Sequence, residues 1–428
     1  MNILHVIIKY SQQHWGGAEG FIHNVARLHA RQGHTVTVAA PNVFGDTARE
    51  ILDGVRVLRF PFFYPSLDRS VAQVKARKGA GLVSLPLLAH VATTRYDIVH
   101  LHLHNAMSTS LAYLLKALGR RFVLHIHSPY LEEPALCNAS IAIYRQTSVP
   151  RKQGFLVAVR DLAKVLFSTR RSLALADLVL WANGVDYAAY RSKYPGRLSV
   201  QMPNGFDPLA FGHGDGNRFR ATHGLEADQK ILLYVANFYA LKNQTLALRI
   251  LHELHRLSDQ ICLVLIGRVT DAAYMDEVRR TLSELDLTEH VVIIPGLAHD
   301  SEALSDAYAA CDLFLVTSKY EAFSVAIVEA MACGRIVCAN RVGGIPYMIR
   351  DGVNGRLLTM TESTVAQVAA GLWETLGNPD AGAALGRAAR MEAEHKYTWE
   401  RIAARLLEIY TYLGGIRAAG SPRTTCFP

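Results

Sequence analysis

The sequence is poor in cysteine and in charge, and each shortage excludes a class of protein. Its six cysteines form no CxxC pair and stand beside no histidine pair at zinc spacing, so a cysteine-based metal site is not expected. Charged residues make up only 19% of the chain and never form a run of five like charges, which argues against a nucleic-acid-binding tail. The most apolar stretch, residues 81–92, is too short to span about 30 Å of hydrocarbon.

The cysteines that are present stand mostly inside apolar runs, as reduced core cysteines do. The first methionine leads directly into a strand-like run with no signal peptide before it. Together with a half-hydrophobic composition, these features predict a folded, cytoplasmic protein. The formal charge of +8, thinly spread, indicates a mild preference for anions.

Short apolar runs alternate with helical patterns along the 428 residues. Runs that are apolar at every position predict parallel strands buried on both faces. The predicted strands are residues 3–8, 35–39, 55–60, 98–103, 122–126, 178–181, 231–236, 262–266, 291–294, 313–316, 336–339 and 356–358. The predicted helices are residues 17–32, 243–257, 273–285, 325–332 and 362–375. Strands and helices in this order predict a doubly wound α/β fold that occurs twice.

A turn cluster at residues 202–211 (MPNGFDPLAF) marks the expected boundary between two domains. We expect a first Rossmann-like domain over residues 1–205 and a second over residues 206–397. A helix at residues 398–413 is expected to return to the first domain, and residues 414–428 are expected to be disordered. Two such sheets predict a ligand cleft between their carboxyl ends.

The most informative segment is residues 318–334 (SKYEAFSVAIVEAMACG). A helix that starts near residues 323–324 would place Glu321 in the preceding loop and Glu329 within the helix. The free N–H groups of such a helix suit a phosphate, and carboxylates suit sugar hydroxyls. The alternative is that Glu321 only compensates the helix dipole and Glu329 is solvated. Burial of Glu329 within VEAMAC favours the functional interpretation.

Lys242 stands between a buried strand and the next helix, where an ammonium can pair with a phosphate or simply face solvent. Gly17, in HWGGAEG after the first strand, either lets the backbone approach a ligand or forms a tight turn. No GxGxxG motif and no acidic residue after the second strand accompany it, so it is not a dinucleotide fingerprint.

Histidines alternate along two strands, in DIVHLHLHN and FVLHIHSP. The strand-end residues His104, Asn105 and His127 are better placed for a cleft than His100 or His125. The alternative is that the histidines are ordinary core residues whose ring nitrogens are hydrogen-bonded. No carboxylate or cysteine at ligand spacing joins them, so a zinc site is only weakly indicated.

In this order, GGAE, DIVHLH, HIHSP, PNGFD, YVANFYALKN, LVLIG, IIPG, EAFSVAIVEAMACG and VGGIPYMIRDGVNGRLL resemble the retaining glycosyltransferases of family 4, over roughly residues 1–410. The resemblance implies the GT-B fold, with an acceptor-binding first domain and a donor-binding second domain. It implies transfer of a hexose from a nucleotide-diphosphate sugar, UDP-sugar first and GDP-mannose next. The implied acceptor is a glycan, a lipid-linked molecule or a small molecule, in polysaccharide or cell-envelope synthesis. Contact with the inner face of a membrane is also consistent with the family.

The resemblance also assigns roles to individual residues. Glu321, His127 and Lys242 would act in catalysis, His104 and Asn105 would lie on the acceptor side, and no metal or other cofactor is expected because no DxD stands at a strand end. The implied donor-binding residues are Gly17, Asn237, Lys242, Arg268, Ala322, Phe323, Ser324 and Glu329.

The sequence departs from the family pattern at several points: Ala322 and Ser324 replace glycines usual after the first glutamate, Tyr347 replaces a glutamate, and two further departures bear on function. Asn237 stands where the family commonly has an arginine that assists the lysine, so that task would pass to Arg268 or Arg341. Residues 130–175 are long for the family and suggest either an acceptor-binding or membrane-facing lid or a solvated helical excursion. Two other functions stay open at this point: a nucleotide-sugar isomerase, and a non-catalytic nucleotide-sugar-binding protein.

Overall fold

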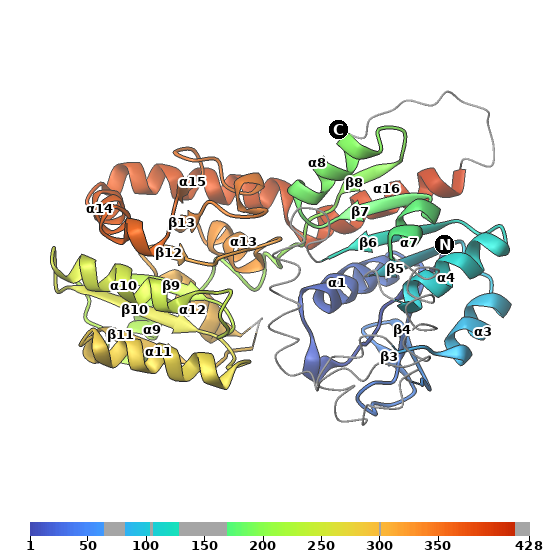
Figure 1. Cartoon of the computed structure of the whole chain (residues 1–428), viewed down its shortest axis with the longest axis horizontal. Helices are drawn as coiled ribbons and strands as arrows, with labels where there is room; N and C mark the ends of the chain where they lie inside the picture. The colour runs from blue at the N-terminus through green and yellow to red at the C-terminus, as the bar shows by residue number, and fades with distance from the viewer. Residues whose placement is uncertain (64–81, 103–105, 128–168, 299–300, 416–428) are drawn as a thin grey trace, which may run out of the picture. The chain divides into compact units, whose positions relative to one another are not determined.

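The computed structural model describes residues 1–63, 82–102, 106–127, 169–298 and 301–415. The chain divides into two compact units, Met1–Asn204 together with the chain from residue 402 onward, and Gly205–Arg401. The sequence-based division lay one residue later, at 205/206. Each unit contains one sheet with helices packed against it, and Figure 1 labels the elements of both.

The sheet of the N-terminal unit has the strand order β3-β4-β2-β1-β5-β6-β7-β8. Its strands are β1 (Asn2–Val6), β2 (Thr35–Pro41), β3 (Arg49–Leu52), β4 (Val55–Phe60), β5 (Ile98–His102), β6 (Phe122–Ile126), β7 (Leu178–Trp181) and β8 (Ser199–Gln201). Its helices are η1 (Gln12–His14), α1 (Gly17–Arg31), α3 (Leu85–Thr93), α4 (Ala106–Ala117), α7 (Thr169–Leu175) and α8 (Gly184–Lys193). The sheet is parallel, as predicted, except at one edge, where β3 pairs antiparallel with β4.

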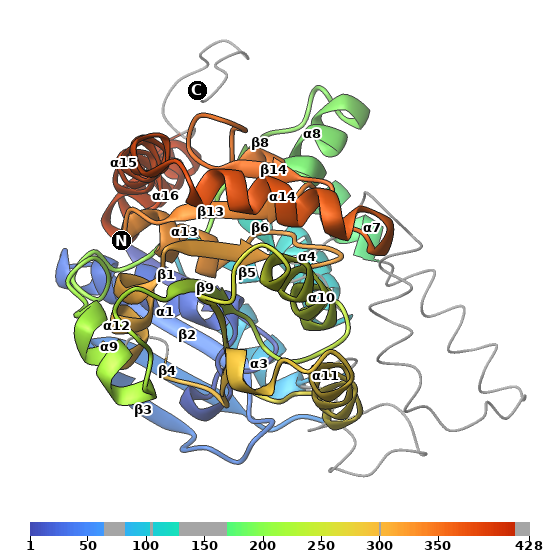
Figure 2. The same cartoon turned by 90° about the vertical axis from the view of Figure 1, so that its left-hand side faces the viewer.

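The sheet of the C-terminal unit has the order β11-β10-β9-β12-β13-β14, and all its pairings are parallel. Its strands are β9 (Lys230–Val235), β10 (Ile261–Ile266), β11 (Val291–Ile294), β12 (Leu313–Val316), β13 (Ile336–Asn340) and β14 (Arg356–Leu358). Its helices are α9 (Gly216–His223), α10 (Gln244–His255), α11 (Ala272–Glu284), η2 (Thr288–His290), α12 (Glu302–Ala310), α13 (Val325–Ala332), η3 (Ile345–Tyr347), η4 (Glu362–Thr364), α14 (Val365–Leu376) and α15 (Pro379–Lys396). Figure 2 looks onto this unit, with α10 beside α14.

The central strands are buried on both faces, as the uninterrupted apolar runs predicted. Every residue of β10 is buried, and so is every residue of β5, which pairs with β1. The cysteines that the structure describes, Cys262, Cys311, Cys333 and Cys338, are free thiols in the core of the C-terminal unit. Their burial agrees with the interpretation of reduced core cysteines.

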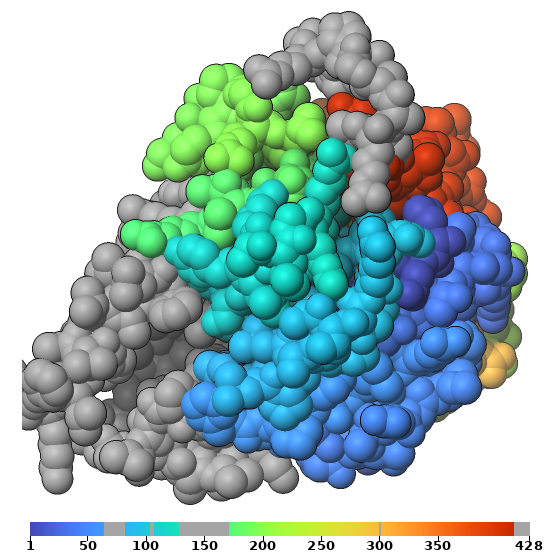
Figure 3. Space-filling view, turned by 90° about the vertical axis from the view of Figure 1, so that its right-hand side faces the viewer, coloured from blue at the N-terminus to red at the C-terminus, as the bar shows by residue number. Residues whose placement is uncertain are grey.

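Helix α16 (Trp399–Gly415) begins in the second unit, and from Ile402 onward its residues belong to the first unit. The Tyr410 hydroxyl lies 2.6 Å from Nδ1 of His100 on β5, and Arg121 donates to the Leu413 carbonyl at 2.7 Å. In Figure 3 the red residues of this chain end are seen against the blue and cyan residues of the N-terminal unit. Among the described helices, none combines the length and the apolar character that crossing a membrane requires.

Candidate functional site

The candidate site in the C-terminal unit lies where β9 and β12 end. β9 is followed in the sheet by β10 on one side and by β12 on the other, so the strand order reverses at this pair. Open α/β sheets bind ligands at such a switch point, outside the carboxyl ends of the strands. Lys242 follows β9, and Glu321 follows β12, so the topology brings together two residues that are 79 positions apart.

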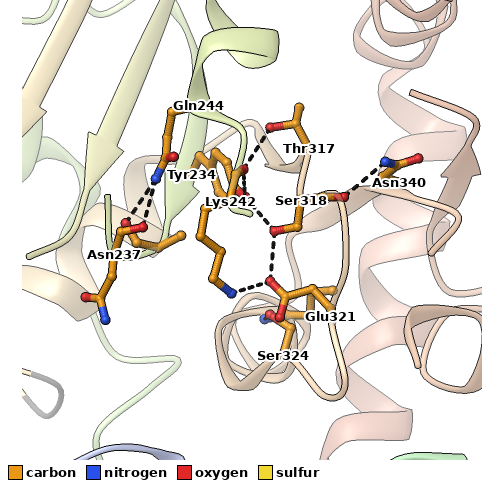
Figure 4. Close-up of polar contacts among 11 residues, drawn as sticks. Tyr234, Asn237, Lys242, Gln244, Thr317, Ser318, Glu321, Ser324 and Asn340 are labelled. Carbon is orange, nitrogen blue, oxygen red and sulfur yellow. Dashed lines mark hydrogen bonds and ion pairs between the residues drawn. The ribbon is translucent and has the colours of Figure 1, made fainter. Parts of the chain in front are cut away.

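Lys242 and Glu321 form an ion pair, with Nζ 2.5 Å from Oε1 (Figure 4). The Ser318 hydroxyl donates to the same carboxylate oxygen at 2.8 Å. The Tyr234 hydroxyl, on β9, donates to the Lys242 carbonyl at 2.5 Å and also contacts Ser318 Oγ at 2.8 Å. The side chains of Lys242 and Glu321 are 17% and 8% exposed. The pair is thus fixed by hydrogen bonds and still reachable from solvent.

The electrostatics of this pair favour the charged form of Lys242. Burial lowers the pKa of Lys242, but the Glu321 carboxylate outweighs it, and the net effect raises that pKa above its usual value. Burial also raises the pKa of Tyr234, so this phenol stays protonated and acts as a hydrogen-bond donor. An ammonium at physiological pH is therefore built into the carboxyl edge of the sheet.

The loop that carries Glu321 is held by backbone contacts to the loop after β13. The Gly344 N–H donates to the Glu321 carbonyl at 2.7 Å, and the Asn340 amide donates to the Ser318 carbonyl at 3.0 Å. Gly343 has φ = +51°, and a Cβ there would lie 2.2 Å from the Glu321 carbonyl oxygen. Glycine is therefore required at this position by both conformation and space.

Gly343→Ala is expected to move the Glu321 loop and to weaken ligand binding at this site, at a cost of about 1–3 kcal/mol in stability. Thermal unfolding and nucleotide binding would be measured together. Gly352→Ala is the matched control, because Gly352 also has positive φ (+72°) but open space around its Cβ position. Equal losses in ligand binding for the two variants would contradict this account of Gly343.

Helix α13 starts after Glu321, as the sequence predicted. Ser324 is its N-cap and accepts from the Ile327 N–H at 3.4 Å, so the first free N–H groups belong to the residues that follow Glu321. Glu329 is 2% exposed, and its Oε2 accepts from the Tyr308 hydroxyl at 2.6 Å. The alternative of a solvated Glu329 is wrong. Burial, and then Glu329, raise the pKa of Tyr308 well above its usual value, so Tyr308 remains a donor.

The cations expected to replace the missing arginine lie in different surroundings. Asn237, exposed after β9, accepts from the backbone N–H of Arg268 at 3.3 Å, which places Arg268 at the end of β10 beside the Lys242 loop. Arg341 instead donates to Asp351 at 3.3 Å and to the Leu357 carbonyl at 3.2 Å. Arg268 follows β10 and Arg341 follows β13, so both stand at the carboxyl edge of the sheet that carries the site.

In the N-terminal unit, Gly17 begins α1 after the first loop, and a Cβ there would meet Asn204 at an ordinary 3.6 Å. Glu19 accepts from the Gly16 N–H at 2.9 Å and pairs with Lys9, and both side chains are buried. Lys9 is not among the predicted site residues, although a lysine between the first predicted strand and GGAE was a usable signal.

His127 follows β6, and His104 and Asn105 lie outside the described residues. Residues 128–168, most of the long stretch between β6 and β7, lie outside them as well. His127 is joined by His5, His100, His102 and His125 in a cluster on neighbouring strands. Burial lowers the pKa of His127 to about 3, so its imidazole is neutral.

Two family models match the chain, and together they cover most of it. Residues 15–189 match the model described as Glycosyltransferase Family 4, and residues 215–392 match Glycosyl transferases group 1. The chain belongs to the family 4 glycosyltransferases. The first model covers the unit with Gly17 and the histidine cluster, and the second covers the unit with Lys242, Glu321 and Glu329.

Relatives of this glycosyltransferase carry related names. A D-inositol 3-phosphate glycosyltransferase of Mycobacterium marinum is 29% identical over 77% of the chain and 66% of its own length. A GDP-mannose-dependent alpha-(1-6)-phosphatidylinositol monomannoside mannosyltransferase of Mycolicibacterium smegmatis is 28% identical over 57% of the chain and 64% of its own length. The chain spans less than two thirds of the length of most of the curated relatives it matches, and about half for some of them.

Solved structures share the fold of this glycosyltransferase over nearly its whole length. Sucrose-phosphate synthase from Thermosynechococcus elongatus superposes with a TM-score of 0.72 at 20% identity, covering 97% of this chain and 99% of that one. HepE from Anabaena, in complex with UDP, gives 0.70 at 22% identity, covering 96% and 100%. The GT-B prediction, two parallel-sheet α/β domains, is confirmed at the level of fold.

Proposed function

We propose that this glycosyltransferase moves a hexose, with retention, from a nucleotide-diphosphate sugar to an acceptor hydroxyl. The observation that carries the proposal is the Lys242–Glu321 pair at the β9/β12 switch point, directly before the N-terminus of α13. An ammonium and free helix N–H groups complement a diphosphate, and an adjacent carboxylate complements sugar hydroxyls.

Each side chain then has a chemical task. The departing nucleoside diphosphate gains negative charge as the sugar bond breaks, and Lys242 with the backbone at residues 322–324 would stabilise that charge. Arg268 would supply the second cation, since its backbone is held by Asn237 and its side chain is exposed. Glu321 would accept from donor-sugar hydroxyls and Glu329 from the ribose. The transfer proposed here needs no metal ion.

His127 is assigned to the sugar that is transferred, and the acceptor to the N-terminal unit with His104 and Asn105. A neutral imidazole can accept or donate one hydrogen bond, which suits a sugar hydroxyl. No side chain is assigned as a nucleophile, so we propose that departure and attack occur on the same face of the sugar.

The relatives support the choice of substrates. Crystal structures of HepE contain UDP or UDP-glucose, and the mycobacterial mannosyltransferase is named as GDP-mannose-dependent. We therefore propose a UDP-sugar first and GDP-mannose second. The acceptors in the relatives' names, an inositol phosphate and a phosphatidylinositol mannoside, are a small molecule and a lipid. A cytoplasmic enzyme of envelope glycan synthesis that contacts the membrane surface fits these acceptors.

A thermal-shift panel of UDP, GDP, ADP and dTDP tests the donor assignment, because a ligand that binds only the folded state raises Tm. Glu329→Ala is expected to weaken binding of the preferred nucleotide about 10–100-fold, the value of a hydrogen bond to a charged group. Tyr308→Phe is the matched control, since it removes the partner of Glu329 and keeps the carboxylate. Absence of a shift with any nucleotide would favour a non-catalytic protein.

A further inference from the structure

Five histidines of the N-terminal unit lie on three neighbouring parallel strands, on one face of the sheet. His5 is on β1, His100 and His102 are on β5, and His125 and His127 are on β6 and directly after it. The register pairs His5 with His100 and His102 with His125, and residues paired in a parallel sheet point to the same face. The first four are at most 1% exposed.

Most polar contacts of these rings are with one another, apart from the contact of His100 with the Tyr410 hydroxyl. Nδ1 of His5 lies 2.9 Å from Nε2 of His102, and Nδ1 of His102 lies 3.0 Å from Nε2 of His127. The rings of His125 and His127 are 3.8 Å apart between centroids, and the edge of Phe21, from α1, packs against His125 at 4.7 Å. Such density of imidazole nitrogens inside a core is costly unless each nitrogen has a partner.

His125 is the residue that the hydrogen bonds leave out. It is 0% exposed, and neither of its ring nitrogens has a hydrogen-bond partner among the described residues. The backbone of Met202 lies close enough to favour its charged form, but not at hydrogen-bonding geometry. Nδ1 of His127 also lacks a partner in the described part of the chain.

We propose that His102, His125 and His127 form a binding site for a divalent transition-metal ion of the zinc class. Each offers one ring nitrogen, and the three lie within 4.8 Å of one another. Two imidazoles on one zinc ion have their nitrogens about 3.3 Å apart, given Zn–N bonds of about 2.0–2.1 Å in a tetrahedron. The 3.0 Å between His102 and His127 is close to this spacing. Three imidazoles leave the fourth position for water or an anion.

The imidazoles are in the form that binds a metal. Burial, with the neighbouring histidines, lowers the pKa of His102 and His125 well below the usual value, so their lone pairs are available at neutral pH. Imidazole nitrogen suits zinc, nickel, copper and iron, whereas calcium and magnesium prefer oxygen. A second trio, His5, His100 and His102, also has its nitrogens within 4.8 Å, but His100 is held by Tyr410 and His5 by His102.

The proposed ion lies in the other unit from Lys242, but it shares His127 with the proposed sugar contact. Its test therefore uses metal binding and not activity. The metal-stripped full-length chain is dialysed against Zn²⁺ and its metal content is measured. About one tightly bound ion per chain is expected, and Co²⁺ in its place should give the visible spectrum of a tetrahedral site.

Variants locate the ion. His125→Gln and, at the less buried strand end, His127→Gln should each weaken Zn²⁺ binding by more than about 10-fold, with the fold checked by circular dichroism. His100→Gln is the control in the other trio. His290→Ala is the control for adventitious binding. The rings of His255 and His290, in the C-terminal unit, have their centroids 4.0 Å apart and form a second histidine pair that could hold an ion. No bound ion, loss only with His100→Gln, or loss only with His290→Ala would each overturn the assignment.

Discussion

Lys242→Ala should lower the turnover of the nucleotide sugar by about 10²–10³-fold, the usual loss when one group that stabilises transition-state charge is removed. The same change leaves Glu321 buried without its ammonium, while the Ser318 hydroxyl still donates to its carboxylate. Since an uncompensated buried carboxylate is destabilising, Tm should also fall. Initial rates and thermal unfolding of the same preparation would separate the two effects.

A double variant distinguishes chemistry from stability. Lys242→Ala combined with Glu321→Gln removes both charges, so Tm should recover while turnover stays low. Lys396→Ala is the matched control, because Lys396 also pairs with a carboxylate, Glu392 at 2.7 Å, on α15. Recovery of turnover in the double variant, or an equal loss with Lys396→Ala, would contradict the role of Lys242.

The strands could be predicted because burial on both faces leaves an unmistakable pattern. All twelve predicted strands are present, and β10 and β12 are apolar and buried at every position. The two that were missed are short edge strands. β3 alternates exposed and half-buried residues, and β8 has three residues, so neither gives a continuous apolar run. Helix α9 was also missed, although its N-cap Asp215 and its C-terminal Gly224 are local signals of a helix.

The candidate site could be predicted as a set of residues but not as a network. The spacing of Glu321 and Glu329 placed one before α13 and the other inside it, as the structure has them. That Lys242 pairs with Glu321 depends on β9 lying next to β12, which is a property of the topology. Tyr308, the partner of Glu329, comes from α12, and nothing near it in the sequence marks it.

The histidines show the same limit in another form. The alternation predicted that the histidines of each strand, β5 and β6, share a face. Ordinary core histidines were an adequate explanation of the sequence pattern. The register between three strands turns them into one cluster that includes His5. This cluster has a consequence for stability that can be measured at mildly acidic pH.

The N-terminal unit should unfold on acidification well before the C-terminal unit. Burial lowers the pKa of His5 to about 3 and of His29 to about 4, and it lowers the pKa of His100, His102 and His125 well below the usual value. A depressed pKa contributes stability above the unfolded value of 6.5 and loses it as pH falls toward the folded value. With His127, whose pKa burial also lowers to about 3, six such groups remove up to about 8 kcal/mol per pH unit, at about 1.36 kcal/mol each. Because domains are stable by about 5–15 kcal/mol, the unit should unfold by about pH 4.5.

Hydrogen exchange, corrected for the intrinsic rate at each pH and measured with a chelator present, would test this difference between the units. Protection of β5 and β6 should fall between about pH 6.5 and 4.5, while β9 and β10 remain protected, since none of the histidines that the structure describes within Gly205–Arg401 is buried. His125→Leu removes one titrating ring that has no hydrogen-bond partner in the described residues. It should reduce the pH dependence by one proton, about 1.4 kcal/mol per pH unit. Simultaneous loss of protection in both units, or an unchanged slope in His125→Leu, would show that other groups drive the acid transition.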